Sequence, residues 1–243
     1  MVAHILILAA GQGSRLRSHI PKQFLEINGI PVLFHSLKNF NQSIPNVKIH
    51  VALPQNYIKK WRSFCIKYNF NTPHDFYTGG DSRIETVFKG LNKIVAEDRI
   101  NNNTIVGIHD AARPFLQSKL IMKLINTATR YGSAIPFIHL KSALSQFNAK
   151  KNNSYSLNRN DYVLTQTPQF FNFEQIFESY CKVFSKFKIK ELSNLFFDDA
   201  SVYDYFKIHA DLQMLEGDES NLKITTDLDY FIAEKLYEFN VKK

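Results

Sequence analysis

Short apolar segments alternate with longer amphipathic ones along the first half of the chain. The apolar segments are rich in β-branched residues and are typical of buried strands: 4–9, 48–53, 104–109 and 133–138. The segments between them place apolar side chains at helical spacing: 31–41, 56–68, 82–95 and 118–131. This alternation predicts a Rossmann-like α/β fold, with a mostly parallel, doubly wound sheet and helices on both faces. Ligands of such sheets bind where the strands end.

The alternation breaks after Ile138. Residues 141–160 are polar and show no helical period. We interpret about 139–162 as a protruding β-arm for dimerisation, with an ordinary surface loop as the alternative. Beyond it the pattern predicts a strand and three helical segments: 163–166, from Phe173, from Asp198, and 227–238. A chain of this length fits a single α/β domain, residues 1–243, that carries the arm.

Composition narrows the class of protein. The net charge of +8 suits a protein that handles polyanions, but the basic residues are spread along the chain rather than gathered in a run, which argues against nucleic acid as the partner. No apolar run reaches the roughly 20 residues of a membrane-spanning helix. The two cysteines, Cys65 and Cys181, have no metal-like spacing and fit a reducing compartment, so we expect a cytoplasmic protein.

A glycine-rich loop, LAAGQGSRLRSHIPKQF, follows the first strand. Gly11 and Gly13 allow backbone amides to approach phosphate oxygens, and the small residues Ala9 and Ala10 keep the entrance clear. The loop lacks the GK[ST] of a P-loop and the third glycine of a dinucleotide fingerprint. Its cations, Arg15 and Lys22, are placed to meet a triphosphate, although either alone would pass for a surface charge.

The string AAGxGxRxxxxxPKQF resembles the signature of sugar-phosphate nucleotidyltransferases. The most similar members are cytidylyltransferases that act on 2-C-methyl-D-erythritol 4-phosphate or on ribitol 5-phosphate, and further matches run in order along nearly the whole chain. The resemblance implies a magnesium-dependent homodimeric enzyme that transfers a cytidylyl group from CTP to a sugar-alcohol phosphate and releases pyrophosphate. The methylerythritol acceptor is favoured, which implies a role in isoprenoid precursor synthesis.

Later segments give the remaining candidate residues. In GGDSRIETVFKGL, the resemblance assigns Gly80, Asp81 and Thr86 to the cytosine pocket, whereas a tight turn with a helix cap is the alternative. In VGIHDAARPF, Asp110 ends a strand and is assigned to metal and substrate binding, with Arg113 as a nearby contact; a simple salt bridge is the alternative. His109 is interpreted as a packed strand-end residue.

Two more basic residues come from the resemblance. Lys223 in LEGDESNLKIT is expected on a strand that points to the glycine loop, and it completes a catalytic set with Arg15 and Lys22. Arg159 in LNRNDY matches an arginine that reaches the partner's substrate phosphate across a dimer; a solvent-facing arginine is the alternative. The segment LTQTPQFF matches a turn with a structural role.

One position departs from the family pattern. The methylerythritol enzymes usually have Asp and Thr at the end of the strand before the arm, where this chain has His139 and Leu140. The departure leaves ribitol phosphate, or another polyol phosphate, open as an alternative acceptor. A non-catalytic nucleotide-binding protein is the alternative of another class, although Arg15, Lys22, Asp110 and Lys223 are more than a sensor requires.

Overall fold

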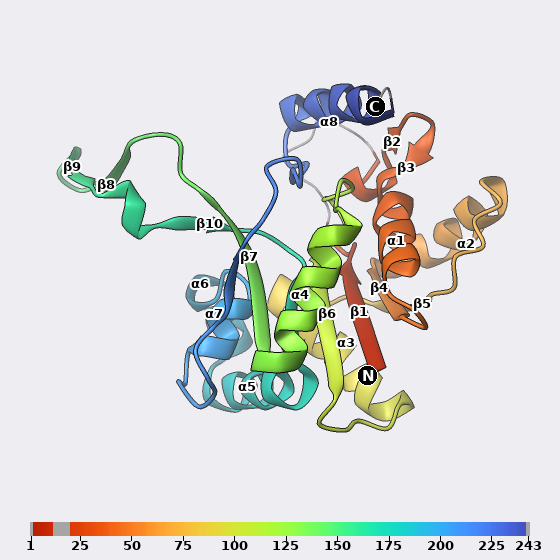
Figure 1. Cartoon of the computed structure of the whole chain (residues 1–243), viewed down its shortest axis with the longest axis horizontal. Coiled ribbons are helices and arrows are strands. Elements are labelled where there is room, and N and C mark those ends of the chain that lie inside the picture. Colours follow the sequence, from red (N-terminus) through yellow and green to blue (C-terminus); the bar gives the residue numbers. More distant parts are fainter. Residues whose placement is uncertain (1, 12–19, 242–243) are drawn as a thin grey trace.

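The computed structural model of this protein describes residues 2–11 and 20–241 (Figure 1). A central sheet runs through the body in the order β10–β7–β11–β6–β1–β4–β5, with β12 paired to β7. Its strands are β1 (Val2–Leu8), β4 (Lys48–Leu53), β5 (Asp75–Thr78), β6 (Thr104–Asp110), β7 (Ser133–His139), β10 (Val163–Thr165), β11 (Gln169–Asn172) and β12 (Met214–Glu216). The four apolar segments singled out in the sequence are β1, β4, β6 and β7.

The sheet is parallel on one side and mixed on the other. Strand β1 pairs in parallel with β4 and β6, and β4 pairs in parallel with β5. Strand β11 lies between β6 and β7 and is antiparallel to both. The prediction of a turn over Leu164–Phe171 is therefore wrong for its second half. Phe170 and Phe171 are fully buried within this strand, which explains why it lies inside the sheet.

Helices cover both faces of the sheet, as predicted. One face packs against α1 (Val32–Ser43), α2 (Ile58–Lys67) and α4 (Ser118–Tyr131). The other packs against α3 (Arg83–Glu97), α5 (Phe173–Lys186), α6 (Ile189–Leu195) and α7 (Asp199–Asp204). Alternate residues of β1 face the two layers, since Ile5 and Ile7 belong to the first core and Leu6 to the second.

A smaller third cluster lies beside the body. Helix α8 (Asp227–Val241) contacts the short strand β2 (Glu26–Ile27), which pairs with β3 (Ile30–Pro31). Ile27, Val32, Ile224 and Ala233 are buried in this cluster. The segment before α8, which carries Lys223, is thus anchored next to the end of the glycine loop.

The segment predicted as an arm contains a hairpin of its own. Strands β8 (Leu144–Asn148) and β9 (Asn153–Leu157) pair only with each other among the described residues. Figure 1 shows this hairpin projecting from the body beyond β7 and β10. A short 3₁₀ turn, η3 (Arg159–Asp161), leads back to the sheet; two others are η1 (Lys22–Phe24) and η2 (Gln55–Tyr57).

No helix in the described part of the chain has the length and apolar character needed to cross a bilayer. Cys65 and Cys181 are both free thiols.

Candidate nucleotide-binding site

A pocket opens where β1 and β6 end side by side. Leu8 and Asp110 are paired in register at these two strand ends, and both line the pocket. The pocket brings together most of the candidate residues from segments far apart in the sequence: Ala10, Gly11, Lys22, Gly80, Asp81, Thr86, Asp110 and Lys223. The carboxyl ends of parallel strands are where such folds place ligands.

The other candidates lie elsewhere. Gly13 and Arg15 fall outside the described residues. Ala9 is buried behind the pocket, and its backbone N–H donates to Ala52 O at 3.0 Å. Arg159 lies in η3, where its Nη1 donates to Lys141 O at 2.6 Å, and it does not line this pocket.

Gln23, which was not predicted as a site residue, holds the described start of the glycine loop. Gln23 is buried, and its Nε2 donates to Ala9 O at 2.6 Å and to Gly11 O at 3.2 Å. A Cβ added at Gly11 would meet no described atom within 4 Å, so protein packing there does not require glycine. The open space beside Gly11 is available to a ligand that approaches the backbone closely. Gln23 was within reach of the sequence, since it stands in the PKQF string.

The second glycine segment is a capped helix start. Ser82 Oγ accepts from Glu85 N at 3.2 Å at the N-terminus of α3, and Thr86 Oγ1 accepts from Gly80 N at 3.0 Å. The helix cap does not exclude a place in the pocket, because Gly80, Asp81 and Thr86 also line it. A Cβ at Gly79 would lie 2.3 Å from the Ala10 Cβ, so a glycine lets the two loops meet.

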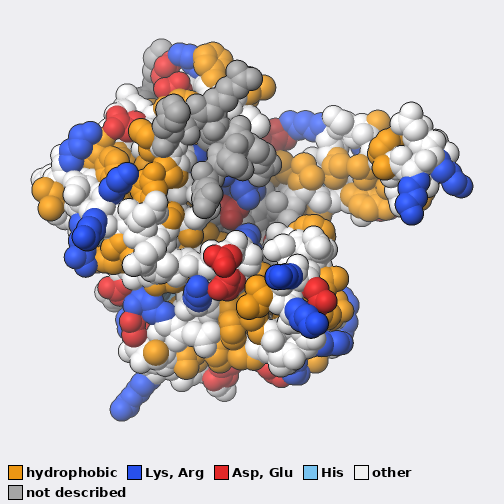
Figure 2. Space-filling view, turned by 180° about the vertical axis from the view of Figure 1, so that it is seen from behind, with side chains coloured by type: hydrophobic (Ala, Val, Ile, Leu, Met, Phe, Trp, Pro, Cys, Tyr) orange, Lys and Arg blue, Asp and Glu red, His pale blue; other side chains and the backbone are white. Residues whose placement is uncertain are grey.

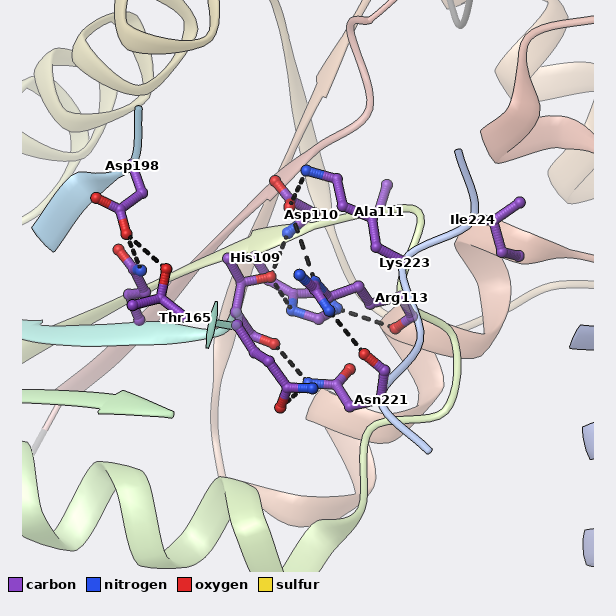
Figure 3. Close-up of polar contacts among 12 residues, drawn as sticks. His109, Asp110, Ala111, Arg113, Thr165, Asp198, Asn221, Lys223 and Ile224 are labelled. Carbon is purple, nitrogen blue, oxygen red and sulfur yellow. Dashed lines mark hydrogen bonds and ion pairs between the residues drawn. The ribbon is translucent and has the colours of Figure 1, made fainter. Parts of the chain in front are cut away.

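Three cations lie around Asp110, and Figure 3 shows two of them, Lys223 and Arg113. Its Oδ2 lies 2.7 Å from Lys223 Nζ and 3.9 Å from Arg113 Nε, and its Oδ1 lies 3.5 Å from Arg83 Nε. Burial by itself would raise the pKa of Asp110, but Arg83, Lys223 and Arg113 outweigh it and hold this pKa far below its ordinary value. Asp110 is therefore a carboxylate at any physiological pH.

His109 is a packed strand-end residue, as expected. It is fully buried; its Nε2 lies 3.2 Å from Arg113 O, and its Nδ1 lies 3.2 Å from Thr167 Oγ1. Since a carbonyl can only accept, Nε2 carries the proton and Nδ1 accepts from the threonine hydroxyl. That hydroxyl in turn accepts from Asp110 N at 3.0 Å. Burial lowers the pKa of His109 to about 4, so the ring is neutral and its role is to hold the strand end.

Arg83 connects the pocket to a buried carboxylate. Its Nη1 and Nη2 donate to Asp199 Oδ1 and Oδ2 at 3.0 and 2.6 Å, while its Nε faces Asp110. Asp199 is fully buried and also accepts from Tyr180 Oη at 2.6 Å. Such a two-point contact fixes the plane of the guanidinium. Neither residue was predicted in this role, and no local pattern reveals it, because the two are 116 positions apart.

Lys223 lies in the loop between β12 and α8, not on a strand as predicted. One backbone hydrogen bond, from Ile224 N to Ala112 O at 2.9 Å, and several side chains hold this loop. Arg113 Nη1 donates to Asn221 O at 2.7 Å, and Asn221 Nδ2 donates to Thr167 O at 2.9 Å (Figure 3). Lys22 Nζ donates to Ile224 O at 3.0 Å, so it too reaches this loop. Arg113 is therefore a residue that fixes the Lys223 loop as well as a neighbour of Asp110.

Comparison with known proteins decides what this pocket belongs to. The family model of 2-C-methyl-D-erythritol 4-phosphate cytidylyltransferase matches residues 3–238. The chain belongs to this family. It is therefore a nucleotidyltransferase, and the family expected from the glycine loop is confirmed.

Individual members of the cytidylyltransferase family match over nearly their whole length. The 2-C-methyl-D-erythritol 4-phosphate cytidylyltransferase of Phocaeicola vulgatus is 33% identical over 97% of this chain and 100% of its own. The crystal structure of the Francisella tularensis enzyme of that name is 27% identical, with a TM-score of 0.77, and covers 97% of this chain and 100% of that one. A 4-diphosphocytidyl-2C-methyl-D-erythritol synthase from Anaerococcus prevotii shares the fold at 23% identity, with a TM-score of 0.79 over 98% and 96% of the two chains.

The pocket of this family member has oxygen donors suited to a hard cation. Asp110 and Asp81 both line it, and Asp110 is kept ionised. Mg²⁺ prefers one or two carboxylates together with phosphate oxygens and water. The residues present therefore fit magnesium bound jointly with a triphosphate.

The departure from the family pattern lies at the end of β7. His139 is exposed, pairs with Val163 of β10, and its ring lies edge-on to Phe137 at 5.3 Å between centroids. Neither His139 nor Leu140 lines the pocket. The nucleotide side of the site is thus unaffected by these two residues.

Proposed function

We propose that this chain transfers the cytidylyl group of CTP to 2-C-methyl-D-erythritol 4-phosphate and releases pyrophosphate, a step of isoprenoid precursor synthesis. The observation that carries the proposal is the pocket in which the glycine loop, the α3 start and the Asp110–Lys223 pair meet at the ends of β1 and β6. Membership of the cytidylyltransferase family supplies the reaction class.

The reaction needs positioning and charge stabilisation more than proton transfer. A phosphate oxygen of the acceptor attacks the α-phosphorus of CTP, a new P–O bond forms, and the bond to pyrophosphate breaks. The acceptor phosphate is already ionised near neutral pH, so it needs no general base. Lys22 and Lys223, with Arg15, would stabilise the negative charge that grows on the phosphoryl oxygens. Gly80, Asp81 and Thr86 would hold the cytosine, and the amides of Ala10, Gly11 and Gly13 would hold the phosphates.

Asp110 would bind Mg²⁺ together with phosphate oxygens, and the ion would neutralise part of the triphosphate charge. Lys223, now paired to Asp110 at 2.7 Å, would move its ammonium to a phosphate when the nucleotide binds. Arg83 would keep the other carboxylate oxygen of Asp110 in place during this exchange, because Asp199 holds its guanidinium at two points.

The arm supports a homodimer as part of the proposal. It exposes several large apolar side chains, and Figure 2 shows hydrophobic side chains gathered on it: Phe147, Tyr155, Tyr162, Val163 and Leu164. Apolar area of this kind on a projecting element is typical of a contact with another chain. Arg159, which lies at the base of the hairpin and outside its own chain's pocket, would then contact the acceptor phosphate in the partner's site.

We further propose that the chain acts as one nucleotidyltransferase domain that carries this arm, without nucleic-acid or membrane partners. The two free cysteines are consistent with the reducing cytoplasm as its compartment.

The experiment that tests the function is pyrophosphate release with Mg²⁺ and CTP, with methylerythritol phosphate and ribitol phosphate offered in parallel. UTP and ATP in place of CTP serve as nucleotide controls. Release with methylerythritol phosphate alone is expected. Release with ribitol phosphate alone would transfer the chain to polyol-phosphate chemistry and make His139 and Leu140 the first residues to examine. CTP binding without release under either acceptor would indicate a non-catalytic nucleotide-binding protein.

A further inference from the structure

A second group of polar side chains lies at the opposite end of α3 from the nucleotide pocket. One ring nitrogen of His50 and one carboxylate oxygen each of Asp75 and Glu97 lie within 4.8 Å of one another. His50 and Asp75 are register partners on β4 and β5, and Glu97 is the last residue of α3. The helix separates this group from the pocket by about 22 Å along its axis. The recess that it lines shares no residue with the nucleotide pocket.

His50 has a buried ring nitrogen that lacks a hydrogen-bond partner. The residue is 1% exposed, and its Nε2 lies 3.1 Å from Nδ1 of His4. Its Nδ1 has no partner among the described residues. A buried polar nitrogen without a partner costs free energy, and such groups usually mark a missing ligand or a functional role. The two carboxylates are the acidic groups that act most strongly on this ring, together with Asp98.

We propose that His50, Asp75 and Glu97 bind a divalent transition cation such as Zn²⁺, with His50 Nδ1 and one oxygen of each carboxylate as ligands. One imidazole, two carboxylates and water are a donor set that zinc accepts. Ligands about 2.1 Å from a tetrahedral ion lie about 3.4 Å apart. The three ligand atoms lie within 4.8 Å of one another, so they need to approach one another by at most about 1.4 Å. Both carboxylates are exposed and can move, although Glu97 has to leave Lys93, whereas the histidine is fixed in the sheet.

His4 supplies the outer contact that a metal-binding histidine normally has. When Nδ1 of His50 binds the ion, the ring proton sits on Nε2 and donates to His4 Nδ1. Burial lowers the pKa of both histidines, that of His4 to about 4, so both rings are neutral and ready to bind or accept at pH 7.

The charges around the site are mixed. Lys93 contacts Glu97, and Lys48 contacts Asp98; both lysines belong to elements that border the recess. Asp75 makes no ion pair within the part of the chain that the structure describes. A cation at the site therefore competes with Lys93 for Glu97 but meets Asp75 unneutralised.

The test is zinc binding to the full chain by isothermal titration calorimetry, in excess Mg²⁺ so that the nucleotide pocket is not counted. We compare wild type with Asp75→Asn/Glu97→Gln, which keeps side-chain size on an exposed surface. The control is Glu178→Gln, because Glu178 is likewise exposed and paired with a lysine of its own helix four positions away. One zinc per chain is expected for wild type and the control, with affinity at least tenfold weaker in the double variant.

Two outcomes would overturn the site. One is the absence of stoichiometric zinc binding in wild type; the other is equal affinity in wild type and in Asp75→Asn/Glu97→Gln. Melting temperature without zinc, and pyrophosphate release, are expected to be unchanged in the double variant, which separates loss of the site from loss of the fold. In protein labelled with ¹⁵N-histidine, zinc should shift the His50 Nδ1 resonance, and zinc bound without this shift would contradict the assignment.

Discussion

The charges of the nucleotide pocket and those of the arm are held in different ways. In the pocket, Asp199, Arg83, Asp110 and Lys223 form a continuous row of ion pairs that links four separate segments through partly or fully buried groups. On the arm, Arg159 contacts only a backbone carbonyl among the described residues, and the hairpin pairs with nothing but itself. The ion pairs of the pocket are thus formed within one chain. The proposed role of the exposed arm, in contrast, depends on contact with a second chain.

The largest effect, on the unfolding free energy, is expected from breaking the Asp199–Arg83 pair at the buried end of this row of ion pairs. Asp199→Asn replaces the fully buried carboxylate that holds Arg83 by a neutral amide, and removing one partner of such a pair costs about 3–5 kcal/mol of unfolding free energy. Chemical denaturation measures this cost. Asp204→Asn, which breaks an exposed pair with Lys207, is the control and should change stability by less than about 1 kcal/mol. Equally small effects of both variants would contradict the idea that the buried Asp199 pair contributes more to stability than the exposed Asp204 pair.

This buried pair also marks a limit of the sequence. Asp198 and Asp199 stand together at a helix start, where acidic residues act as caps, and Asp198 does cap α7. Nothing local distinguishes Asp199, whose partner lies 116 residues away. The role of Asp199 follows from its burial and from its pairing with a distant residue, and the spacing of residues in the sequence predicts neither.

The fold could be predicted from the sequence more fully than this pair. The long apolar periods of β1, β4, β6 and β7 and of the four helices between them specify their type, because the burial of each face imposes a regular pattern. Strand β11 escaped notice, since four residues directly after a proline give no period and its direction is set by the neighbours on both sides. The residues that line the pocket were predicted through motifs. Gln23 stands within one of those motifs, whereas the roles of Arg83 and Asn221 in holding the pocket needed the structure.

A smaller effect, on kcat, is expected from removing Lys223, the cation at the solvent-exposed end of the row of ion pairs. Lys223→Ala should lower kcat by about 100- to 1,000-fold, the range for loss of one preorganised charge contact to a transition state. Stability should change little, because Lys223 is partly exposed. Lys22→Ala should act likewise, by at least about 100-fold. The exposed Lys182 gives the matched control, Lys182→Ala, which should keep full activity; a comparable loss there would contradict a specific role for Lys223.

The buried histidine His109 should make the unfolding free energy of the protein depend on pH. The folded pKa of His109 is lowered to about 4 from an ordinary 6.5, so between these values the unfolded chain binds a proton that the folded chain does not. Stability contributed by the neutral ring is therefore present above pH 6.5 and is lost as the pH falls towards 4. At pH 5 the loss is about 2 kcal/mol relative to pH 7.

Denaturation at pH 7 and pH 5 measures this loss. His109→Gln removes the His109 share, so its stability should fall less between the two pH values than that of wild type. His139→Gln, at the exposed end of β7, is the control and should keep the wild-type difference. A control variant that loses the pH dependence as strongly as His109→Gln would remove buried histidine as the cause.

The smallest effect concerns the arm, and it tests whether the arm completes a site in another chain. Arg159→Ala should lower kcat/KM for the acceptor by about tenfold, equivalent to one charge-assisted phosphate contact. Mixing the Arg159→Ala chain with the nearly inactive Lys223→Ala chain then shows whether Arg159 acts in the partner's site or in its own. In a mixed dimer the intact pocket of the first chain receives Arg159 from the second, so activity should rise above the sum of the two variants. If Arg159 instead acts within its own chain, the mixture gives only that sum, because each chain then carries one defective site. The same mixture with a chain that lacks both Lys223 and Arg159 should show no gain, since it has no arginine to offer.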